Sequence, residues 1–268
     1  GQQERRVRGV RGKNRRVHGL LRCEMKILSI GNSFSQDATR YLQDIAASAG
    51  ENLFVRNLYI GGCSLEMHAK NIAENAPAYD YEENTRGIEK ISITDALARE
   101  DWDYVTVQQV SGLSGKIETY EPYLTEVLDT VKAACPKAKI AFHRTWAYEI
   151  DSTHGNFAYY LKNQMNMYHA IVEASAEAAQ KHSLPIIGSG DFIQHLRAIP
   201  PFDYKNGGTS LCRDGFHMSL DYGRYAVGLV WFKFFTGRNA ADVTFAPENT
   251  DPAYINIIRQ EADKFIAK

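Results

Sequence analysis

Short apolar runs alternate along this chain with longer stretches in which apolar residues recur at helical spacing. These runs cover residues 26–30, 53–59, 104–108, 139–143 and 184–188, and all but the second are strongly apolar. Alternation of this kind is typical of βα units wound around a parallel sheet. The sequence therefore predicts an α/β fold in which five parallel strands form one sheet.

The stretches between the runs have the period of helices, and the first three end at Gly50, Pro77 and Pro136. We expect helices over residues 39–50, 66–77, 120–136, 157–182 and 220–235. The last of these is expected to be an amphipathic final helix. Residues 75–93 are polar with weak periodicity, and a surface loop is favoured there over an insertion that covers a site.

Charge is distributed unevenly along the chain. Residues 1–24 hold eight Arg or Lys against two Glu, whereas the patterned sequence begins at Met25. We therefore expect a basic N-terminal extension, residues 1–24, followed by one domain, residues 25–268. The extension lacks the interleaved aromatic residues of a nucleic-acid-binding module, so no nucleic-acid partner is expected.

Several classes of protein are excluded by what the sequence lacks. No run approaches the roughly 18 consecutive apolar residues of a membrane span. The four cysteines form no CxxC pair and have no zinc-ligand spacing with histidine, and no glycine-rich phosphate-binding signature occurs. We expect no metal and no cofactor. The first residue is Gly rather than Met, so localisation stays open. The composition does not decide the oligomeric state.

Ser33 is the first candidate functional residue. It lies in GNSFS, directly after the first expected strand, and ligands of open parallel sheets bind at the carboxyl ends of the strands. Gly31 permits a sharp turn, which directs the Ser33 hydroxyl toward this crevice. The alternative is that Ser33, Ser35 or Asp37 merely caps the following helix. The GxSxG elbow of the α/β-hydrolases is absent.

Asp214 and His217 are the partners that a nucleophilic serine needs. They lie three positions apart in DGFHMS, near the C-terminal end. A carboxylate can hold one imidazole nitrogen while the other faces a serine, which makes the imidazole a general base. A DxxH pair alone is frequent, so the alternative is that His217 is an ordinary loop or packing residue.

Two further strand ends offer donors for an oxyanion hole. GGCS, which contains Gly62, follows the second strand, and QQVS, which begins with Gln108 and Gln109, follows the third. A glycine lets a backbone N–H approach a substrate oxygen closely, and glutamine supplies side-chain N–H groups. Taken alone, each motif is better explained as a turn or a polar strand end.

Taken in order, GNSFS, GGCS, QQVS and DGFHMS resemble the four sequence blocks of the SGNH, or GDSL-like, hydrolases. Within that superfamily the chain looks most like a bacterial branch similar to sialate O-acetylesterase-like and other carbohydrate esterases. The resemblance implies a flavodoxin-like, three-layer α/β/α sandwich with Ser33 as nucleophile, His217 as base and Asp214 orienting the base. It also implies an oxyanion hole made by the N–H groups of Ser33 and Gly62 with a third donor.

The chain departs from the family pattern at two places. Asn32 stands where the first block usually has Asp, which removes a charge beside the nucleophile. Gln108 and Gln109 stand where the third block should offer Asn, and either glutamine could be the equivalent residue. Both changes leave the three triad residues in place.

Trp146 follows the fourth strand in AFHRTWAYE and offers a flat apolar surface for a sugar ring. With His143 and Arg144 it is a candidate pocket residue, and packing is the equal alternative. The remaining histidines, His154 among them, have no partner spacing and are interpreted as structural or solvated.

The sequence thus predicts a serine esterase that removes a short acyl group, acetyl above all, from a carbohydrate through an acyl-enzyme. Its expected partner is a small-molecule or glycan ester. The alternative is a non-catalytic carbohydrate-binding protein that kept the scaffold.

Overall fold

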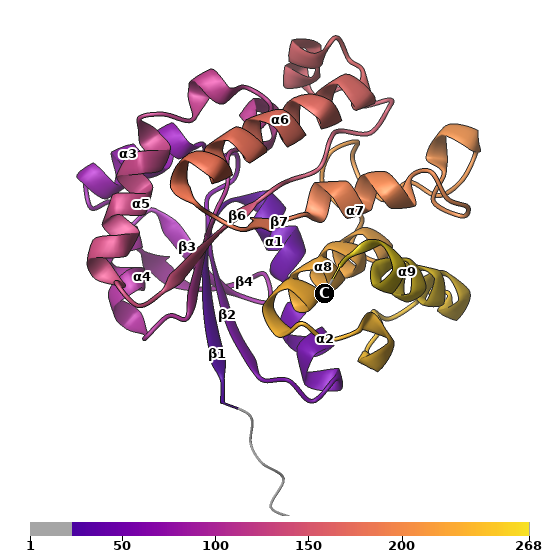
Figure 1. Cartoon of the computed structure of the whole chain (residues 1–268), viewed down its shortest axis with the longest axis horizontal. Coiled ribbons are helices and arrows are strands. Elements are labelled where there is room, and N and C mark those ends of the chain that lie inside the picture. Colours follow the sequence, from indigo (N-terminus) through magenta and orange to yellow (C-terminus); the bar gives the residue numbers. More distant parts are fainter. Residues whose placement is uncertain (1–22, 268) are drawn as a thin grey trace, which may run out of the picture.

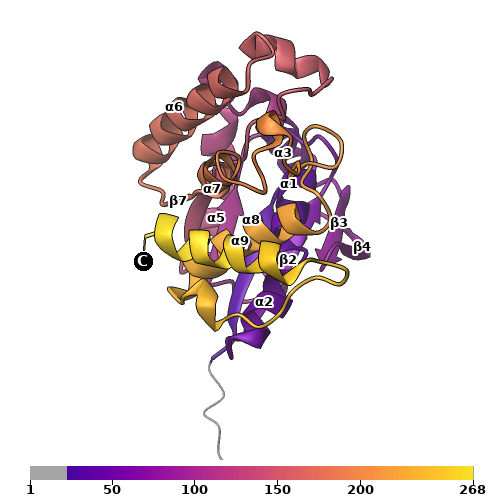
Figure 2. The same cartoon turned by 90° about the vertical axis from the view of Figure 1, so that its right-hand side faces the viewer.

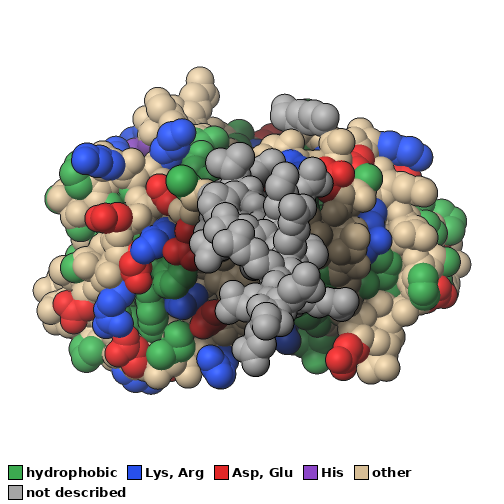
Figure 3. All heavy atoms as spheres, turned by 90° about the horizontal axis from the view of Figure 1, so that it is seen from below, with side chains coloured by type: hydrophobic (Ala, Val, Ile, Leu, Met, Phe, Trp, Pro, Cys, Tyr) green, Lys and Arg blue, Asp and Glu red, His purple; other side chains and the backbone are tan. Residues whose placement is uncertain are grey.

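The computed structural model describes residues 23–267. The expected basic extension, residues 1–24, lies outside the described residues except for its last two positions. Within the described range, no helix is both long and apolar enough to cross a membrane. Figure 3 views the molecule from below, the side on which β1 begins, where acidic and basic side chains are interspersed.

One sheet runs through the centre of the molecule in the order β4-β3-β2-β1-β5-β6-β7 (Figure 1). Its strands are β1 (Met25–Ile30), β2 (Leu53–Tyr59), β3 (Tyr79–Glu83), β4 (Arg86–Ile91), β5 (Tyr104–Val107), β6 (Lys139–His143) and β7 (Ile186–Ile187). The five expected strands are present as β1, β2, β5, β6 and β7, and they are parallel to one another. The expectation of five strands in all is wrong, because β3 and β4 join the sheet in antiparallel pairing.

The two additional strands form a hairpin in the segment that is expected to be a surface loop, residues 75–93, and that expectation is also wrong. Tyr79 and Tyr81 are buried, whereas β4 is exposed along most of its length as the edge of the sheet. The hairpin turns at Asn84 and Thr85, whose φ angles of 49° and 70° are those that a two-residue turn requires. The hairpin therefore extends the sheet beyond β2.

Helices cover both faces of the sheet (Figures 1 and 2). One face carries α3 (Leu65–Ala73), α4 (Ile93–Arg99) and α5 (Tyr123–Ala134). The other carries α1 (Ser33–Thr39), α2 (Leu42–Ser48), α7 (Ser189–Leu196), α8 (Tyr222–Thr236) and α9 (Pro252–Phe265). The long α6 (Gln164–His182) contacts β7 and contributes apolar residues to the cores of both faces. The molecule is thus an α/β fold with a mixed, mostly parallel sheet flanked by helices.

Several helices differ from the sequence expectation, and α1, α4 and α7 were not expected at all. α8 is neither amphipathic nor final: it is buried along nearly its whole length, because α9 packs across it (Figure 2). α9 begins with Asp251 as N-cap and Pro252 in its first turn, a start signal that the sequence contains. The helix expected over 157–182 begins only at Gln164, because a separate 3₁₀ turn, η3 (Gly155–Tyr160), precedes it.

Candidate active site

A cavity of about 530 Å³ opens at the carboxyl ends of β1, β2 and β5, the end of the sheet at which parallel α/β proteins bind ligands. Its walls come from the loops after these strands, from the segment around η3 and from the loop before α8. The lining residues are Asn32, Ser33, Phe34, Tyr59, Gly61, Gly62, Ser64, Val110, Ser111, Gly112, Leu113, His154, Asn156, Tyr159, Phe216 and His217.

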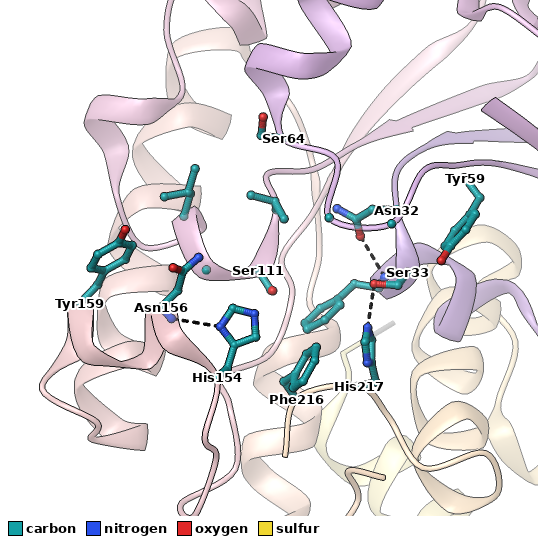
Figure 4. A pocket seen from close by; sticks show the side chains of 16 residues that line it. Asn32, Ser33, Tyr59, Ser64, Ser111, His154, Asn156, Tyr159, Phe216 and His217 are labelled. Carbon is teal, nitrogen blue, oxygen red and sulfur yellow. Dashed lines mark hydrogen bonds between the residues drawn. The ribbon is translucent and has the colours of Figure 1, made fainter. Parts of the chain in front are cut away.

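Ser33 and His217 lie together at one side of this cavity (Figure 4), and Asp214 contacts the His217 ring outside the cavity lining. Nε2 of His217 is 2.9 Å from the Ser33 hydroxyl oxygen, and Nδ1 of His217 is 2.6 Å from Oδ2 of Asp214. Because the carboxylate accepts a hydrogen bond from the Nδ1–H group, Nε2 is left as the acceptor that faces the hydroxyl. The geometry is that of a serine with a general base and an orienting carboxylate.

Asp214 is held by its own loop. Its Oδ1 accepts hydrogen bonds from the backbone N–H groups of Phe216, at 3.1 Å, and His217, at 2.8 Å. Partial burial raises the pKa of Asp214, but the hydrogen bonds from the His217 ring and from the two backbone groups outweigh it and lower the pKa below its usual value. The carboxylate is therefore ionised at neutral pH and stabilises a positive charge on the ring.

The turn that presents Ser33 is set by its neighbours. Asn32 is the N-cap of α1, and its side chain accepts a hydrogen bond from the Phe34 N–H at 2.9 Å. Gly31 has no room for a side chain, because a Cβ there would lie 1.8 Å from the Ser35 hydroxyl oxygen. Ser33 itself is the first residue of α1 and does not act as its cap.

Asp37 joins α1, which begins with Ser33, to the segment that carries His217. It is fully buried, and its Oδ1 accepts from Arg213 at 2.9 Å and from Arg224 of α8 at 2.8 Å. Its Oδ2 accepts from the backbone N–H of Met218, the residue after His217, at 2.9 Å. One carboxylate thereby ties α1, α8 and the loop of His217 together.

Gln108 and Gln109 are both buried and do not line the cavity. Oε1 of Gln109 accepts from the backbone N–H groups of Leu65, at 3.0 Å, and Val110, at 2.8 Å. Its Nε2 donates to Thr119. The expectation of a glutamine side chain in the oxyanion hole is therefore not met, because the polar atoms of Gln109 hold loops together and those of Gln108 are also engaged.

Gln108 belongs to a buried hydrogen-bond chain that reaches the loop after β2. Its Nε2 donates to Oδ1 of Asn32 at 2.9 Å, and Nδ2 of Asn32 donates to the Cys63 carbonyl at 3.1 Å. Its Oε1 is 2.7 Å from Nδ1 of His143, whose Nε2 is 2.7 Å from the Ser189 hydroxyl. Burial lowers the pKa of His143 to about 3, so the ring is neutral, with Nδ1 as its donor and Nε2 as its acceptor.

Trp146 does not line the cavity either. It is a packing residue, which was the alternative interpretation of its position in the sequence. The side chain is fully buried, stacks on Phe34 with ring centroids 4.3 Å apart and donates from Nε1 to the Phe216 carbonyl at 2.7 Å. It thus supports two cavity residues from beneath. His143 and Arg144 also lie outside the cavity lining.

His154 and Asn156 line the cavity, and sequence reasoning missed them because it interpreted His154 as structural or solvated. Nδ1 of His154 accepts from the Asn156 N–H at 3.0 Å. Their only sequence signal is position, since THGN lies in the loop that follows β6. Between residues 23 and 267, no three His, Cys, Asp or Glu side chains gather in a way that could hold a metal ion.

Comparison with known proteins gives the family. The DUF4886 model, a domain of unknown function, matches residues 26–264. A crystallised DUF4886 family protein from Bacteroides uniformis is 38% identical, with a TM-score of 0.84 over 90% of this chain and 94% of that chain. No curated protein matches the chain.

More distant structures share the fold. A protein of Slackia heliotrinireducens that is proposed to be an SGNH hydrolase is 22% identical, with a TM-score of 0.55 over 80% of this chain and 100% of that chain. The acetyl xylan esterase AlAXEase is 12% identical, with a TM-score of 0.52 over 78% of this chain and 99% of that chain. The chain therefore belongs to the DUF4886 family, and its fold is similar to that of SGNH hydrolases.

Proposed function

We propose that this protein is an SGNH-type serine esterase. The observation that carries the proposal is the 2.9 Å approach of His217 Nε2 to the Ser33 hydroxyl oxygen, with Asp214 on the other ring nitrogen. The fold similarity to hydrolases at low identity agrees with it. A triad, an adjoining cavity and a glycine-rich loop together are the elements that ester hydrolysis needs.

In the first step His217 takes the Ser33 proton while the oxygen attacks the ester carbonyl. The tetrahedral intermediate collapses as His217 gives that proton to the departing alcohol, and an acyl-enzyme remains. Water then attacks the acyl-enzyme, His217 again accepts and returns a proton, and the carboxylic acid leaves with Ser33 restored. Asp214 keeps the ring in the reactive tautomer throughout.

Backbone groups are the proposed oxyanion donors. The Ser33 N–H lies in the first turn of α1, where N–H groups have no acceptor within the helix. Gly62 lines the cavity and has a φ of +67°, a conformation that other residues rarely adopt. A third donor from a glutamine side chain forms no part of the proposal, because both glutamines are bonded elsewhere.

The alcohol part of the ester is proposed to be a carbohydrate, and its acyl part is proposed to be short, such as acetyl. Aromatic rings and neutral polar side chains line an open cavity, which suits a hydroxyl-rich ring. Hydrolysis of 4-nitrophenyl acetate compared with the octanoate ester tests the preference for a short acyl group. Faster turnover of octanoate would contradict it.

The central test is hydrolysis of 4-nitrophenyl acetate by the purified protein and by Ser33→Ala and His217→Ala. Loss of a triad member is expected to lower kcat by about 10³-fold or more. Ser48→Ala and His169→Ala, which change the same residue types far from the cavity on α2 and α6, serve as controls and are expected to keep wild-type rates. Equal rates in all five proteins would reject the esterase.

The alternative, a non-catalytic carbohydrate-binding protein, is favoured by one observation. The glutamine side chains after β5 are turned away from the cavity, so an oxyanion hole here has one donor fewer than the resemblance implies. Loss of one such donor typically costs about 10²- to 10³-fold in rate. Sugar binding without any turnover that depends on Ser33 would support this alternative.

A further inference from the structure

The wall of the cavity across from Ser33 and His217 carries polar side chains with atoms free to bind a ligand (Figure 4). Nδ1 of His154 accepts from a backbone N–H, so its proton is on Nε2. Among the described residues, the side-chain amide of Asn156 and the hydroxyl of Tyr159 form no hydrogen bond. Tyr159 is 53% exposed, so its hydroxyl is accessible.

Aromatic rings connect this wall to the reacting pair. The Phe216 ring lies between the two histidines, with its centroid 4.8 Å from that of His154 and 4.2 Å from that of His217. Such a surface suits the C–H face of a sugar ring, while neighbouring neutral polar groups bind its hydroxyls. A ring seated there would have an ester oxygen within reach of His217.

The cavity contains no permanent charge of its own. Of its lining residues, all of which the structure describes, none is Lys, Arg, Asp or Glu. The Asp214 carboxylate lies behind the His217 ring, on the side away from Ser33. A carboxylate or phosphate on the ligand would therefore lose water without gaining a cationic partner, and it would be repelled by Asp214.

We propose that His154, Asn156 and Tyr159 form the subsite for the alcohol part of the ester, and that this alcohol is an uncharged sugar. This inference rests on the esterase proposed above and adds a substrate class to it. Neutral donors and acceptors on one wall and aromatic rings on the floor bind a neutral acetylated sugar. The same site discriminates against acetylated uronic or sialic acids.

The test uses two ligands that differ only at C6, monoacetylated glucose and monoacetylated glucuronic acid. Titration calorimetry with Ser33→Ala measures binding without requiring turnover. The glucose ester is expected to bind at least about fivefold more tightly, since an uncompensated charge costs about 1 kcal/mol or more. Equal or tighter binding of the glucuronate ester, or binding of neither, would overturn the inference.

Variants of the wall sharpen the test. In the Ser33→Ala background, Asn156→Ala is expected to weaken binding of the glucose ester about 5- to 10-fold. Tyr159→Arg changes an exposed residue and is expected to raise the relative affinity for the glucuronate ester several-fold, whereas Tyr159→Phe is not. An unchanged ratio in Tyr159→Arg would contradict the assigned subsite. Hydrolysis of 4-nitrophenyl acetate by the wild-type protein separately decides the esterase itself.

Discussion

Gln108 has both ends of its side-chain amide bonded inside the protein. Trp231 Nε1 donates to the Ser189 hydroxyl at 3.2 Å, and that hydroxyl faces the acceptor nitrogen of His143. His143 then donates to Gln108, which donates to Asn32. Every link donates in the same direction, so only one orientation of the Gln108 amide satisfies both neighbours. Gln108 therefore holds Asn32, the N-cap residue of α1, and so positions the turn that presents Ser33.

Gln108→Glu tests this role because it keeps the size of the side chain and removes its only donor. The new carboxylate would still accept from His143, but it would present an oxygen to the Asn32 oxygen. We expect kcat for 4-nitrophenyl acetate to fall roughly 10- to 100-fold with little change in KM, since small displacements of reacting groups have effects of this size.

The pH profile separates positioning from a general structural effect. Protonation of the introduced carboxyl group restores a donor, so the rate relative to wild type is expected to recover as pH falls. Gln180→Glu makes the same chemical change on an exposed face of α6 and is the control. A deficit in Gln108→Glu that stays constant with pH would argue against the positioning role.

At the scale of elements, the β3–β4 hairpin is the part of the sheet that the sequence analysis did not predict. Glu82 is buried in β3, where its carboxylate accepts from Asn57 at 3.0 Å and from Gln36 at 2.7 Å. These partners come from β2 and α1, so no local pattern could show that a glutamate points inward. The turn contains Thr85 at positive φ where a two-residue hairpin turn usually has glycine. The Asn-Gly pair that commonly indicates a hairpin is therefore absent from this turn.

The parallel strands other than β2 were predictable because they are strongly apolar, as strands buried on both faces require. β2 contains Arg56 and Asn57 and gave a weaker signal. Ser33, Asp214 and His217 could be singled out because their chemistry is specific in combination, although 184 positions separate the serine from the histidine. The direction of Trp146 could not be predicted, since it depends on how the chain turns after β6. His154 could not be predicted as a cavity residue either, because it lies in a loop with no periodic pattern.

Asp37 is a junction between elements, and its loss should be felt in both stability and activity. Asp37→Ala would leave Arg224, which is only 9% exposed, without its carboxylate partner. Removing one partner of a buried ion pair typically costs about 3–5 kcal/mol of folding free energy. Urea unfolding measures this loss, and kcat should fall because the loop of His217 is no longer tied to α1.

The matched control is Asp242→Ala. Asp242 pairs with Arg238 at 3.2 Å on the surface, where the two side chains are 44% and 29% exposed. Exposed pairs contribute at most about 1 kcal/mol, so this variant should unfold close to the wild-type midpoint. Similar destabilisation by both substitutions would show that Asp37 does not act as the proposed junction.

At the scale of the whole molecule, the sheet separates two apolar cores, and each face carries a fully buried histidine. His143 packs edge-on against Trp231, with centroids 4.8 Å apart, and His68 stacks on Tyr79, with centroids 5.6 Å apart. Burial lowers the pKa of each ring to about 3. Both cores therefore exclude the protonated form of a residue that ordinarily titrates near neutrality.

Stability should consequently fall on acidification well before the carboxylates titrate. Between pH 6.5 and 3 the unfolded chain binds protons at His68 and His143 that the folded protein does not, so folding is favoured fully above this window and progressively less within it. We expect each ring to remove roughly 2 kcal/mol from the unfolding free energy between pH 7 and pH 5. Urea unfolding at the two pH values measures the difference.

In His143→Gln the difference in unfolding free energy between pH 7 and pH 5 should shrink by the contribution of one histidine, whatever the overall stability of the variant. In His169→Gln, which changes a residue on the exposed face of α6, the difference should stay the same. If His143→Gln keeps the full wild-type difference, the ring at position 143 is protonated in the folded protein, and the donor directions of the buried hydrogen-bond chain are wrong.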